Sequence, residues 1–511
     1  MKHVHPIENI FGAVWKSAVT ETVARHQSGG VTRGGGIESD HPLIAAADRY
    51  IDSMEKGHAL KPPSKHGQLR DSDPDVAPYL MQLHHQAAHA QINNDKALQA
   101  QLNAQLARYK FGNPLWQQML IQYFEYYAQY PYHLGGQPHY RSWKDTGGSI
   151  DYGVIEWRIP ATGRVAVIGD IGTGTDVAAA VLLSALSFKP DAILHVGDVY
   201  YSGTRFEFAH RYTGLFETVF RAQKHRAPVF GVPGNHEYFT GNIAYFECLD
   251  SGKLAPHKNQ KQTASYFCLR SADDGWQFLG MDTGYNGHYM AVTPEAQQKA
   301  LDVIHAKHLT GDDSEASLPI QLPPNASPMV TLRDDEAAWH RDKMDRFSGR
   351  SILLSHHQLY SAVQTIGVKQ SGPADMNRAW INTAIWQQLG AYFGEKVAAW
   401  IWGHEHNLGI YEDNYRPSDW PAADDVYKTL PKGRCAGHAA IPVQNTENPY
   451  ATTFPVPLAK PDLQLGLVNG WYNRGFEILD LGGAGQPVRA RYFQLAEADP
   501  TPLLIFDEQI A

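Results

Sequence analysis

Short apolar runs alternate with amphipathic segments from Arg164 onward, and polar, glycine-containing turns follow several of the runs. The run Val165-Ala166-Val167-Ile168 has the length and composition of a buried strand, and Asp176 to Phe188 has the period of a helix. This alternation predicts βαβ units and an α/β fold. Further strands are expected at residues 192–196, 229–232, 265–269, 276–281, 351–354, 398–402, 475–481 and 488–495, with a helix over 205–223. Residues 265–281 are expected to form a hairpin, and the last two strands an antiparallel pair.

The first 150 residues have a different pattern. The part before about residue 75 contains the glycine-rich segment Gly29 to Gly36, which predicts loosely organised structure. Apolar residues recur at helical spacing from Pro78 to about Lys110, and Pro114 is expected to begin a second helix with a buried aromatic stripe. We predict an α-helical N-terminal region over residues 1–150, of unknown role, followed by the α/β domain over residues 151–505.

Two segments interrupt the strand pattern of this domain, His308 to Asp334 and Glu412 to Pro461. Both are rich in proline or charged residues, and long loops within a compact domain tend to be functional or disordered. We expect loop insertions near residues 308–334 and 412–461, and a lid over the functional site for the second.

The charge balance and the cysteines limit the classes of partner. The chain has 44 basic and 53 acidic residues, a formal net charge of −9, which argues against nucleic acid or an anionic membrane surface as the main partner. Its three cysteines have no CxxC spacing, and no uncharged apolar run approaches the length of a membrane span. We therefore expect a cytoplasmic protein without a disulfide framework or a thiolate zinc site.

Five of the expected strands are followed by residues suited to metal ions. A buried strand that ends in Gly-Asp presents a carboxylate at the carboxyl end of a sheet, where open α/β folds place their ligands. The five sequences are Gly169-Asp170-Ile171-Gly172, Gly197-Asp198-Val199-Tyr200-Tyr201, Gly234-Asn235-His236-Glu237, Ser355-His356 and Gly403-His404-Glu405-His406. Because a shared sheet edge would bring all five together, they predict a single site. Two metal ions bridged by a carboxylate can activate a water and bind a phosphoryl oxygen there.

The order GDxG, GDxxY, GNHE, xxxH and GHxH, over about residues 164 to 410, resembles the calcineurin-like metallophosphoesterases and, within them, the purple acid phosphatases. The resemblance implies a four-layer α/β/β/α sandwich of two mixed β-sheets. It implies that the first metal is bound by Asp170, Tyr201 and His406, the second by Asn235, His356 and His404, and that Asp198 bridges both. It also implies that His236 lies beside the phosphate, with His357 as a neighbour in the pocket.

The identity of the two metals depends on Gly172 and Tyr201. Many members of the family have a histidine where this chain has Gly172, and Tyr201 stands where a phenolate can replace the missing ligand. A phenolate strongly favours a trivalent cation, because the pKa of tyrosine is near 10 and only a highly charged ion holds the anion at neutral pH. We expect Fe(III) at the Tyr201 site and Fe(II), Zn or Mn at the second, among which the ligands do not distinguish.

These expectations describe a dinuclear metal-dependent phosphoester hydrolase, in which a metal-bound hydroxide attacks phosphorus in line and His236 assists the leaving oxygen. A small phosphorylated substrate is expected, and a phosphomonoester is favoured over a diester. Two alternatives stay open. One is a phosphodiesterase acting on nucleotides or lipid headgroups, and the other is a catalytically idle scaffold that binds a protein partner through the helical region.

Overall fold

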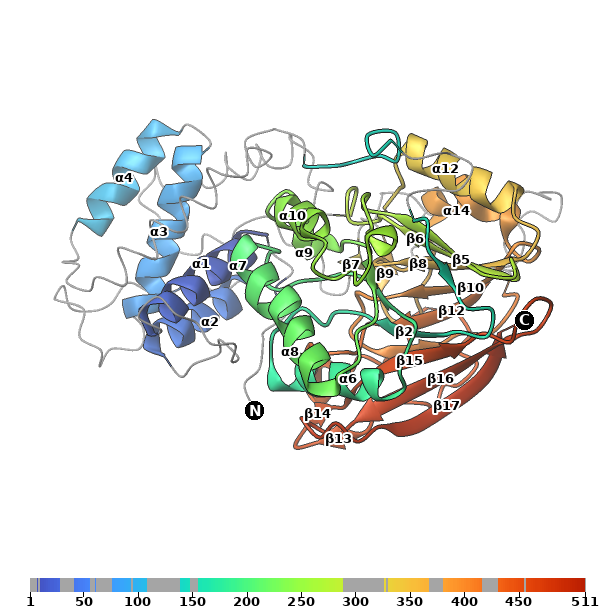
Figure 1. The fold of residues 1–511 in the computed structure, drawn as a ribbon. Coiled ribbons are helices and arrows are strands. Elements are labelled where there is room, and N and C mark those ends of the chain that lie inside the picture. Colours follow the sequence, from blue (N-terminus) through green and yellow to red (C-terminus); the bar gives the residue numbers. More distant parts are fainter. Residues whose placement is uncertain are drawn as a thin grey trace.

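The computed structural model describes most of the α/β domain and four helices of the N-terminal region. The described residues are 7, 10–27, 41–55, 60, 76–92, 95–107, 138–147, 155–287, 326–327, 330–366, 380–415, 431–454 and 456–510. The N-terminal helices are α1 (Ile10–Gln27), α2 (Pro42–Glu55), α3 (Val76–Ile92) and α4 (Lys96–Leu106). They lie to one side of the sheets, with α1 and α2 next to the sheet domain and α4 farther away (Figure 1).

A six-stranded mixed sheet holds the first βαβ units together with the C-terminal strands. Its order is β17 (Leu503–Ile510), β16 (Val488–Leu495), β15 (Arg474–Asp480), β2 (Arg164–Ile168), β3 (Ala192–His195) and β4 (Val229–Gly231). The neighbours β2, β3 and β4 are parallel, so their carboxyl ends lie at the same edge, whereas β15, β16 and β17 are antiparallel to their neighbours. The helix after β2, α6 (Asp176–Ser187), begins where the Thr175 side chain accepts a hydrogen bond from the amide of Ala178.

A second, seven-stranded mixed sheet contains the later strands. Its order is β1 (Arg158–Ile159), β5 (Phe267–Ser271), β6 (Trp276–Met281), β8 (Arg350–Ser355), β10 (Val397–Trp402), β12 (Lys432–Ala436) and β11 (Leu408–Ile410). The central strands β6, β8, β10 and β12 are parallel, so β8 and β10 end side by side. Two-stranded pairs complete the described strands: β7 (Ala326–Ser327) with β9 (Thr365–Ile366), and β13 (Leu467–Val468) with β14 (Trp471–Tyr472).

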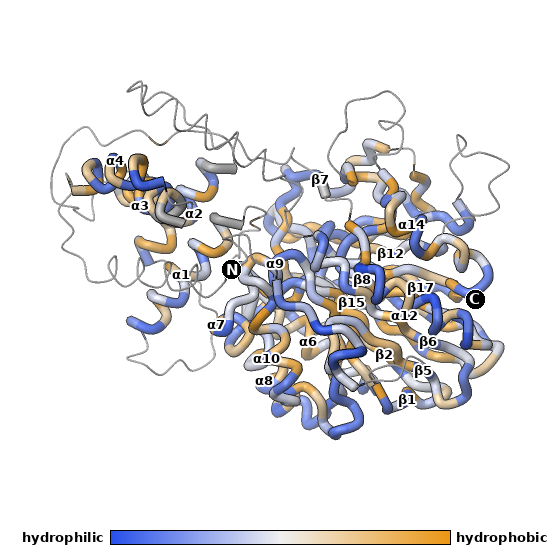
Figure 2. Tube along the Cα trace, turned by 90° about the horizontal axis from the view of Figure 1, so that it is seen from above, coloured by the Kyte–Doolittle hydropathy of each residue, from blue (hydrophilic) through white to orange (hydrophobic). Residues whose placement is uncertain are grey.

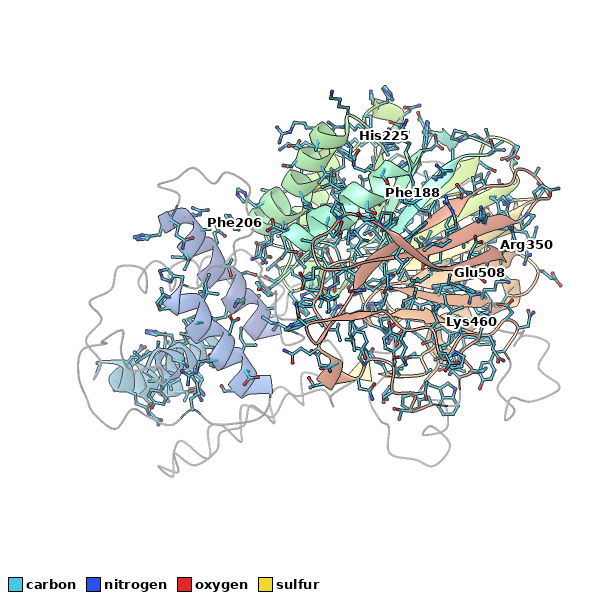
Figure 3. All side chains as sticks on the ribbon, turned by 90° about the horizontal axis from the view of Figure 1, so that it is seen from below. Phe188, Phe206, His225, Arg350, Lys460 and Glu508 are labelled. Atoms are coloured by element: carbon cyan, nitrogen blue, oxygen red, sulfur yellow. The ribbon has the colours of Figure 1, made fainter. Side chains whose placement is uncertain are left out.

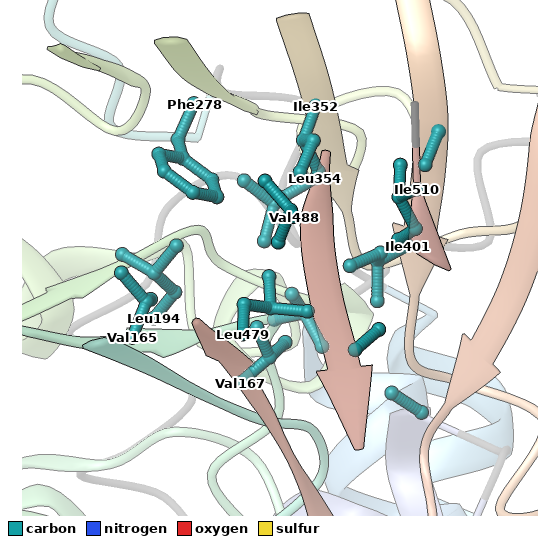
Figure 4. Close-up of a cluster of buried hydrophobic side chains, with 14 of the residues drawn as sticks. Val165, Val167, Leu194, Phe278, Ile352, Leu354, Ile401, Leu479, Val488 and Ile510 are labelled. Atoms are coloured by element: carbon teal, nitrogen blue, oxygen red, sulfur yellow. The ribbon is translucent and has the colours of Figure 1, made fainter. Parts of the chain in front are cut away.

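The two sheets pack face to face. Alternate residues along each strand face opposite sides of its sheet, so one set lies between the sheets and the other faces the helices. Val165 and Val167 of β2 meet Ile352 and Leu354 of β8 in the core between the sheets, whereas Ala166 faces the helices on the other side (Figure 4). Hydrophobic stretches run along β2 and β15 through the middle of the domain, which fits this arrangement (Figure 2).

Helices cover the outer face of each sheet. On the six-stranded sheet, α6 packs beside the π-helical turn η2 (Phe208–Thr213) and α8 (Gly214–Gln223), and α7 (Arg205–Glu207) precedes η2. Phe188, at the C-terminal end of α6, lies 4.7 Å from Phe493, measured between ring centroids (Figure 3). On the seven-stranded sheet lie α12 (Asp334–Asp345) and α14 (Thr383–Leu389). The other helices among the described residues are α9 (Asn235–Tyr238), α10 (Ile243–Ser251), η3 (Lys258–Gln260), η4 (Gly390–Tyr392) and η5 (Asn445–Glu447). The four-layer α/β/β/α sandwich of two mixed sheets is thus confirmed, as is a helical N-terminal region before it.

Several predictions about individual segments were wrong. The part before residue 75, predicted to be loosely organised, contains α1 and α2, and the single helix predicted from Pro78 is broken into α3 and α4. The segment 412–461, predicted to be a loop insertion and a lid, contains β12, a strand of the seven-stranded sheet. At least this part of the segment belongs to the sheet and is not a lid. The helix predicted from Pro114 and most of the insertion at 308–334 lie outside the described residues.

Candidate metal centre

The five predicted sequences meet where the carboxyl ends of both sheets converge. Asp170 and Asp198 follow β2 and β3, His356 follows β8, and His404 and His406 follow β10, while Asn235 is the first residue of α9 after β4. Four of these residues have positive φ angles, 60° for Asp170, 75° for Asp198, 66° for His404 and 51° for His406. Such angles are uncommon outside glycine and are found where a tight turn aims a side chain at a functional site.

Glycines allow the strand ends to approach each other closely. Gly197 has a φ of +100°, and a Cβ there would lie 2.6 Å from Nδ1 of His356. A Cβ at Gly234 would lie 2.0 Å from Oδ1 of Asp198. Side chains at these two positions would therefore push apart residues that the sequence predicted to act together.

One half of the centre, which we call the carboxylate half, consists of Asp170, Asp198, Tyr200 and His406. The hydroxyl oxygen of Tyr200 lies 2.9 Å from Oδ1 of Asp170, 3.0 Å from Oδ2 of Asp198 and 3.0 Å from Nε2 of His406. Ligand atoms of the two aspartates and the histidine lie within 4.8 Å of one another, as expected for residues able to hold one metal ion. Asp170, Asp198 and Tyr200 are buried, and His406 is the more accessible member.

The tyrosine of this half is not the one that the sequence predicted. The GDxxY spacing selects Tyr201, but the hydroxyl that meets Asp170 and Asp198 belongs to Tyr200. Two cations lie over the ring of Tyr201, with Nζ of Lys16 5.6 Å and Cζ of Arg211 4.8 Å from the ring centroid. Both tyrosines share a buried cluster with α1, a helix whose packing beside this loop the sequence pattern did not reveal.

The other half, which we call the imidazole half, consists of Asn235, His356 and His404. Nε2 of His356 lies 3.0 Å from Oδ1 of Asn235 and 3.1 Å from Nδ1 of His404. On the other side of the ring, Nδ1 of His356 lies 2.9 Å from the carbonyl oxygen of Val196 and can donate to it, which leaves Nε2 free to bind a metal. Asp198 joins the two halves, because its Oδ2 lies 3.3 Å from Nε2 of His356.

His236 and His357 border the centre. Nδ1 of His236 lies 2.5 Å from the carbonyl oxygen of Tyr201, and its Nε2 is 3.8 Å from Oδ2 of Asp198. His357 lies beside the imidazole half: its ligand atoms group with those of His356 and His404 within 4.8 Å. The hydroxyl of Thr283 fixes its position, at 3.0 Å from the amide nitrogen and 3.1 Å from Nδ1 of His357. His357 is therefore close enough to serve either as a pocket residue or as a further ligand.

The electrostatics of the buried groups fit a metal centre. Burial lowers the pKa of His356 and of His404 well below the usual value, and lowers the pKa of His236 to about 3, so the imidazoles are neutral and able to donate a lone pair. Burial, followed by the charges of Asp170 and Asp198, raises the pKa of Tyr200 well above its usual value. Buried carboxylates need a compensating charge, and carboxylate, imidazole and amide donors together suit two cations.

Two glutamates that the sequence analysis did not single out hold the loops of the centre. The carboxylate of Glu237 accepts hydrogen bonds from the amides of Gly234 at 2.7 Å and Asp198 at 3.3 Å, and so joins two ligand loops. Glu207 accepts from the amides of Tyr201, Ser202 and Thr204. Thr204 and Glu207 form a capping box, and a Thr-x-x-Glu pattern was the signal that could have identified the second glutamate.

The comparisons with known proteins agree with this geometry. Residues 163–408 match the family model described as calcineurin-like phosphoesterase, a segment that contains every residue of both halves. A search of the curated proteins found no match. Among the described residues, no helix is both long enough and apolar enough to cross a membrane. The segment 163–408 is therefore similar to calcineurin-like phosphoesterase domains, and its candidate metal ligands gather where the two sheets end.

Proposed function

We propose that the chain is a dinuclear metal-dependent phosphoester hydrolase of the purple acid phosphatase type, acting on small phosphomonoesters. One observation carries the proposal: seven donor side chains, from loops that follow five strands, converge in one cluster within the matched segment. A scaffold without catalysis would not need such a donor set, and Asp198 is suited to bridge two ions because it contacts both halves.

In this proposal each half holds one metal. Asp170, Tyr200 and His406 hold the first, Asn235, His356 and His404 hold the second, and Asp198 holds both. When bound, the metals supply Lewis-acid activation of water and offset the charge of the phosphoryl group. His236 hydrogen-bonds the carbonyl of Tyr201 through Nδ1, so its Nε2 is the atom that faces the centre and exchanges a proton with the leaving oxygen. His357 contacts the bound phosphate from the imidazole half.

We propose Fe(III) for the carboxylate half and Fe(II), Zn or Mn for the imidazole half. Tyr200 supports this choice. Burial and the two aspartates raise its pKa, so only a highly charged cation against the hydroxyl would hold the phenolate near neutral pH. The neutral nitrogen and amide donors of the imidazole half suit a divalent ion.

The test combines elemental analysis, a visible spectrum and turnover of a chromogenic phosphomonoester and the matching diester. We expect two metals per chain, a phenolate-to-iron absorption band that disappears in Tyr200→Phe and persists in Tyr201→Phe, and faster turnover of the monoester. Faster turnover of the diester would favour a phosphodiesterase acting on nucleotides or lipid headgroups. Colourless protein that contains only Zn or Mn would contradict the Fe(III) proposal. If the protein turns over neither compound in a metal-dependent way, the proposal that it is an enzyme is wrong.

We further propose a reducing, cytoplasmic location with a small phosphorylated molecule, rather than nucleic acid or membrane, as the partner. The free thiols of Cys248, Cys268 and Cys435 support the location, because oxidising compartments favour paired cysteines. Fractionation of cells that express the tagged protein tests it, and recovery outside the cytoplasm would contradict it.

A further inference from the structure

Helix α1 of the N-terminal region lies directly against the loop that carries Tyr200. Trp15 and Val19 of α1 belong to the same buried cluster as Tyr200, Tyr201 and Phe239 of the α/β domain. If the N-terminal region were a separate accessory domain, α1 would not be expected to contact the loop that carries Tyr200. In Figure 1, α1 lies beside α7, the short helix that follows this loop. The N-terminal region is therefore packed on the candidate centre rather than attached at a distance from it.

A polar contact within this interface connects α1 to the backbone of the loop. The hydroxyl of Ser17 lies 2.7 Å from the hydroxyl of Ser202 and donates to Oε1 of Glu207, also at 2.7 Å. The carboxylate of Glu207 accepts in turn from the amides of Ser202 at 3.1 Å and Thr204 at 3.0 Å, and from the amide of Tyr201. Ser17 thus contacts, together with Arg211, the carboxylate that accepts from three amides of residues 201–204.

Charged side chains reinforce the same contact. Lys16 of α1 lies over the ring of Tyr201 and forms an ion pair with Asp48 of α2. Arg211 lies over the ring as well, and its Nη1 donates to the carbonyl oxygen of Tyr200 at 2.9 Å. Cation–π contacts of desolvated side chains are favourable. The loop is therefore held both by α1 and by η2.

We propose that Ser17 is a positioning residue of the metal centre: through Glu207 and Ser202, α1 holds the loop so that the Tyr200 hydroxyl stays in reach of Asp170 and Asp198. A buried hydroxyl that hydrogen-bonds a carboxylate fixes the geometry around it, and the shell around metal ligands controls how well they are placed. Only the catalytic consequence rests on the proposed function. The mechanical consequence, an ordered loop, does not.

Thr22 supplies a matched control within the same helix. It is buried like Ser17, and each hydroxyl oxygen lies within hydrogen-bond distance of the carbonyl oxygen four residues earlier, 2.8 Å from Ala18 for Thr22 and 3.0 Å from Ala13 for Ser17. Of the two, Ser17 is the one bonded to Ser202 and Glu207. Comparing Ser17→Ala with Thr22→Ala in the full chain therefore separates the contact with the loop from the general cost of removing a buried hydroxyl.

The experiment measures hydrogen exchange of the peptide that spans residues 199–207, together with kcat and KM for a chromogenic phosphomonoester. In Ser17→Ala we expect about tenfold faster exchange in this peptide and a kcat about fivefold to tenfold lower with KM nearly unchanged, the size expected for one ordinary intramolecular hydrogen bond. In Thr22→Ala we expect both quantities within about twofold of the wild type.

Equal exchange of this peptide in Ser17→Ala and Thr22→Ala would overturn the proposal. If Ser17→Ala does not fold, Ser202→Ala removes one of the two contacts of Ser17 with the loop, leaves the one with Glu207, and is expected to give a smaller increase, about threefold, which still exceeds the change expected in Thr22→Ala. If the wild-type protein hydrolyses neither monoester nor diester, the proposed function is wrong but this proposal is still tested. The exchange comparison would then still decide whether α1 holds the loop.

Discussion

The two halves of the metal centre are built differently. Members of the imidazole half contact each other directly, and His356 is oriented by a carbonyl of the neighbouring strand end, that of Val196. The carboxylate half depends on Tyr200, whose loop is held by Glu207, by Arg211 and by contacts with α1. The first arrangement follows from where strands end. The second requires packing between parts of the chain that lie far apart in sequence.

Asp198 gives the largest expected effect, because it is the residue that both halves share. Its Oδ2 lies 3.0 Å from the Tyr200 hydroxyl and 3.3 Å from Nε2 of His356. We expect Asp198→Asn to lower kcat/KM by about a thousandfold, the upper range for loss of one charge-stabilising group, and to reduce the metal content to less than two per chain. Elemental analysis and turnover of the chromogenic monoester measure both. Asp176→Asn, at the exposed start of α6, is the control. Two bound metals with undiminished turnover would mean that the halves do not share this carboxylate.

The next effect distinguishes the two adjacent tyrosines. Tyr200→Phe removes the hydroxyl between Asp170 and Asp198, and we expect kcat/KM to fall by about a hundredfold. Tyr201→Phe keeps the ring over which Lys16 and Arg211 lie, so turnover should stay within about threefold of the wild type. Steady-state kinetics and the visible spectrum of both variants check this pair. The reverse order of effects would restore the assignment that the GDxxY spacing favours.

Most of the sheet framework could be predicted because the strands alternate between two apolar environments. Val165 and Val167 face the core between the sheets, while Ala166 faces α6 and α8. The sequence shows this as a short, continuous apolar run, which predicts a buried strand. The strand β12 was missed because Arg434 interrupts its apolar pattern. In the fold that arginine is buried and paired with Glu508 of β17, a contact across 74 positions of the chain that no local pattern contains.

The candidate site could be predicted at the strand ends and not in the loop beyond Asp198. Motif spacing assigns His356 and His404 directly, since each follows its strand by one or two residues. Spacing alone does not decide which of Tyr200 and Tyr201 faces the aspartates. The helix α1 shares a buried cluster with both, and it lacks an amphipathic pattern because polar and apolar side chains are buried around most of its length. A helix with no exposed face gives no periodic signal.

A smaller effect is expected from His357, the neighbour of the imidazole half. We expect His357→Asn to lower kcat about tenfold while the metal content stays at two per chain, because a pocket residue contacts phosphate without holding a metal. Loss of one metal would instead make His357 a fourth ligand of this half. Thr283→Val serves as the graded comparison: it removes the hydroxyl that contacts the His357 amide and Nδ1, and turnover should fall by about threefold.

The smallest effect lies outside both halves and concerns stability alone. Glu477 of β15 is buried, and neither carboxylate oxygen has a hydrogen-bond partner among the described residues, with Arg434 and Glu508 as the nearest charges. Burial raises its pKa well above 4.5, so the folded state holds the proton to higher pH than the unfolded state does. The stability that this proton contributes is complete below about pH 4.5 and is lost as the pH rises toward the raised value. Glu477→Gln, which stays neutral, should therefore stabilise the fold by about 1 kcal/mol at pH 8 and by much less at pH 5, with turnover per bound metal unchanged. Urea unfolding at the two pH values measures the difference; an equal gain at both would show that the buried charge is not its cause, and a change in turnover would show that the core between the sheets is coupled to the centre.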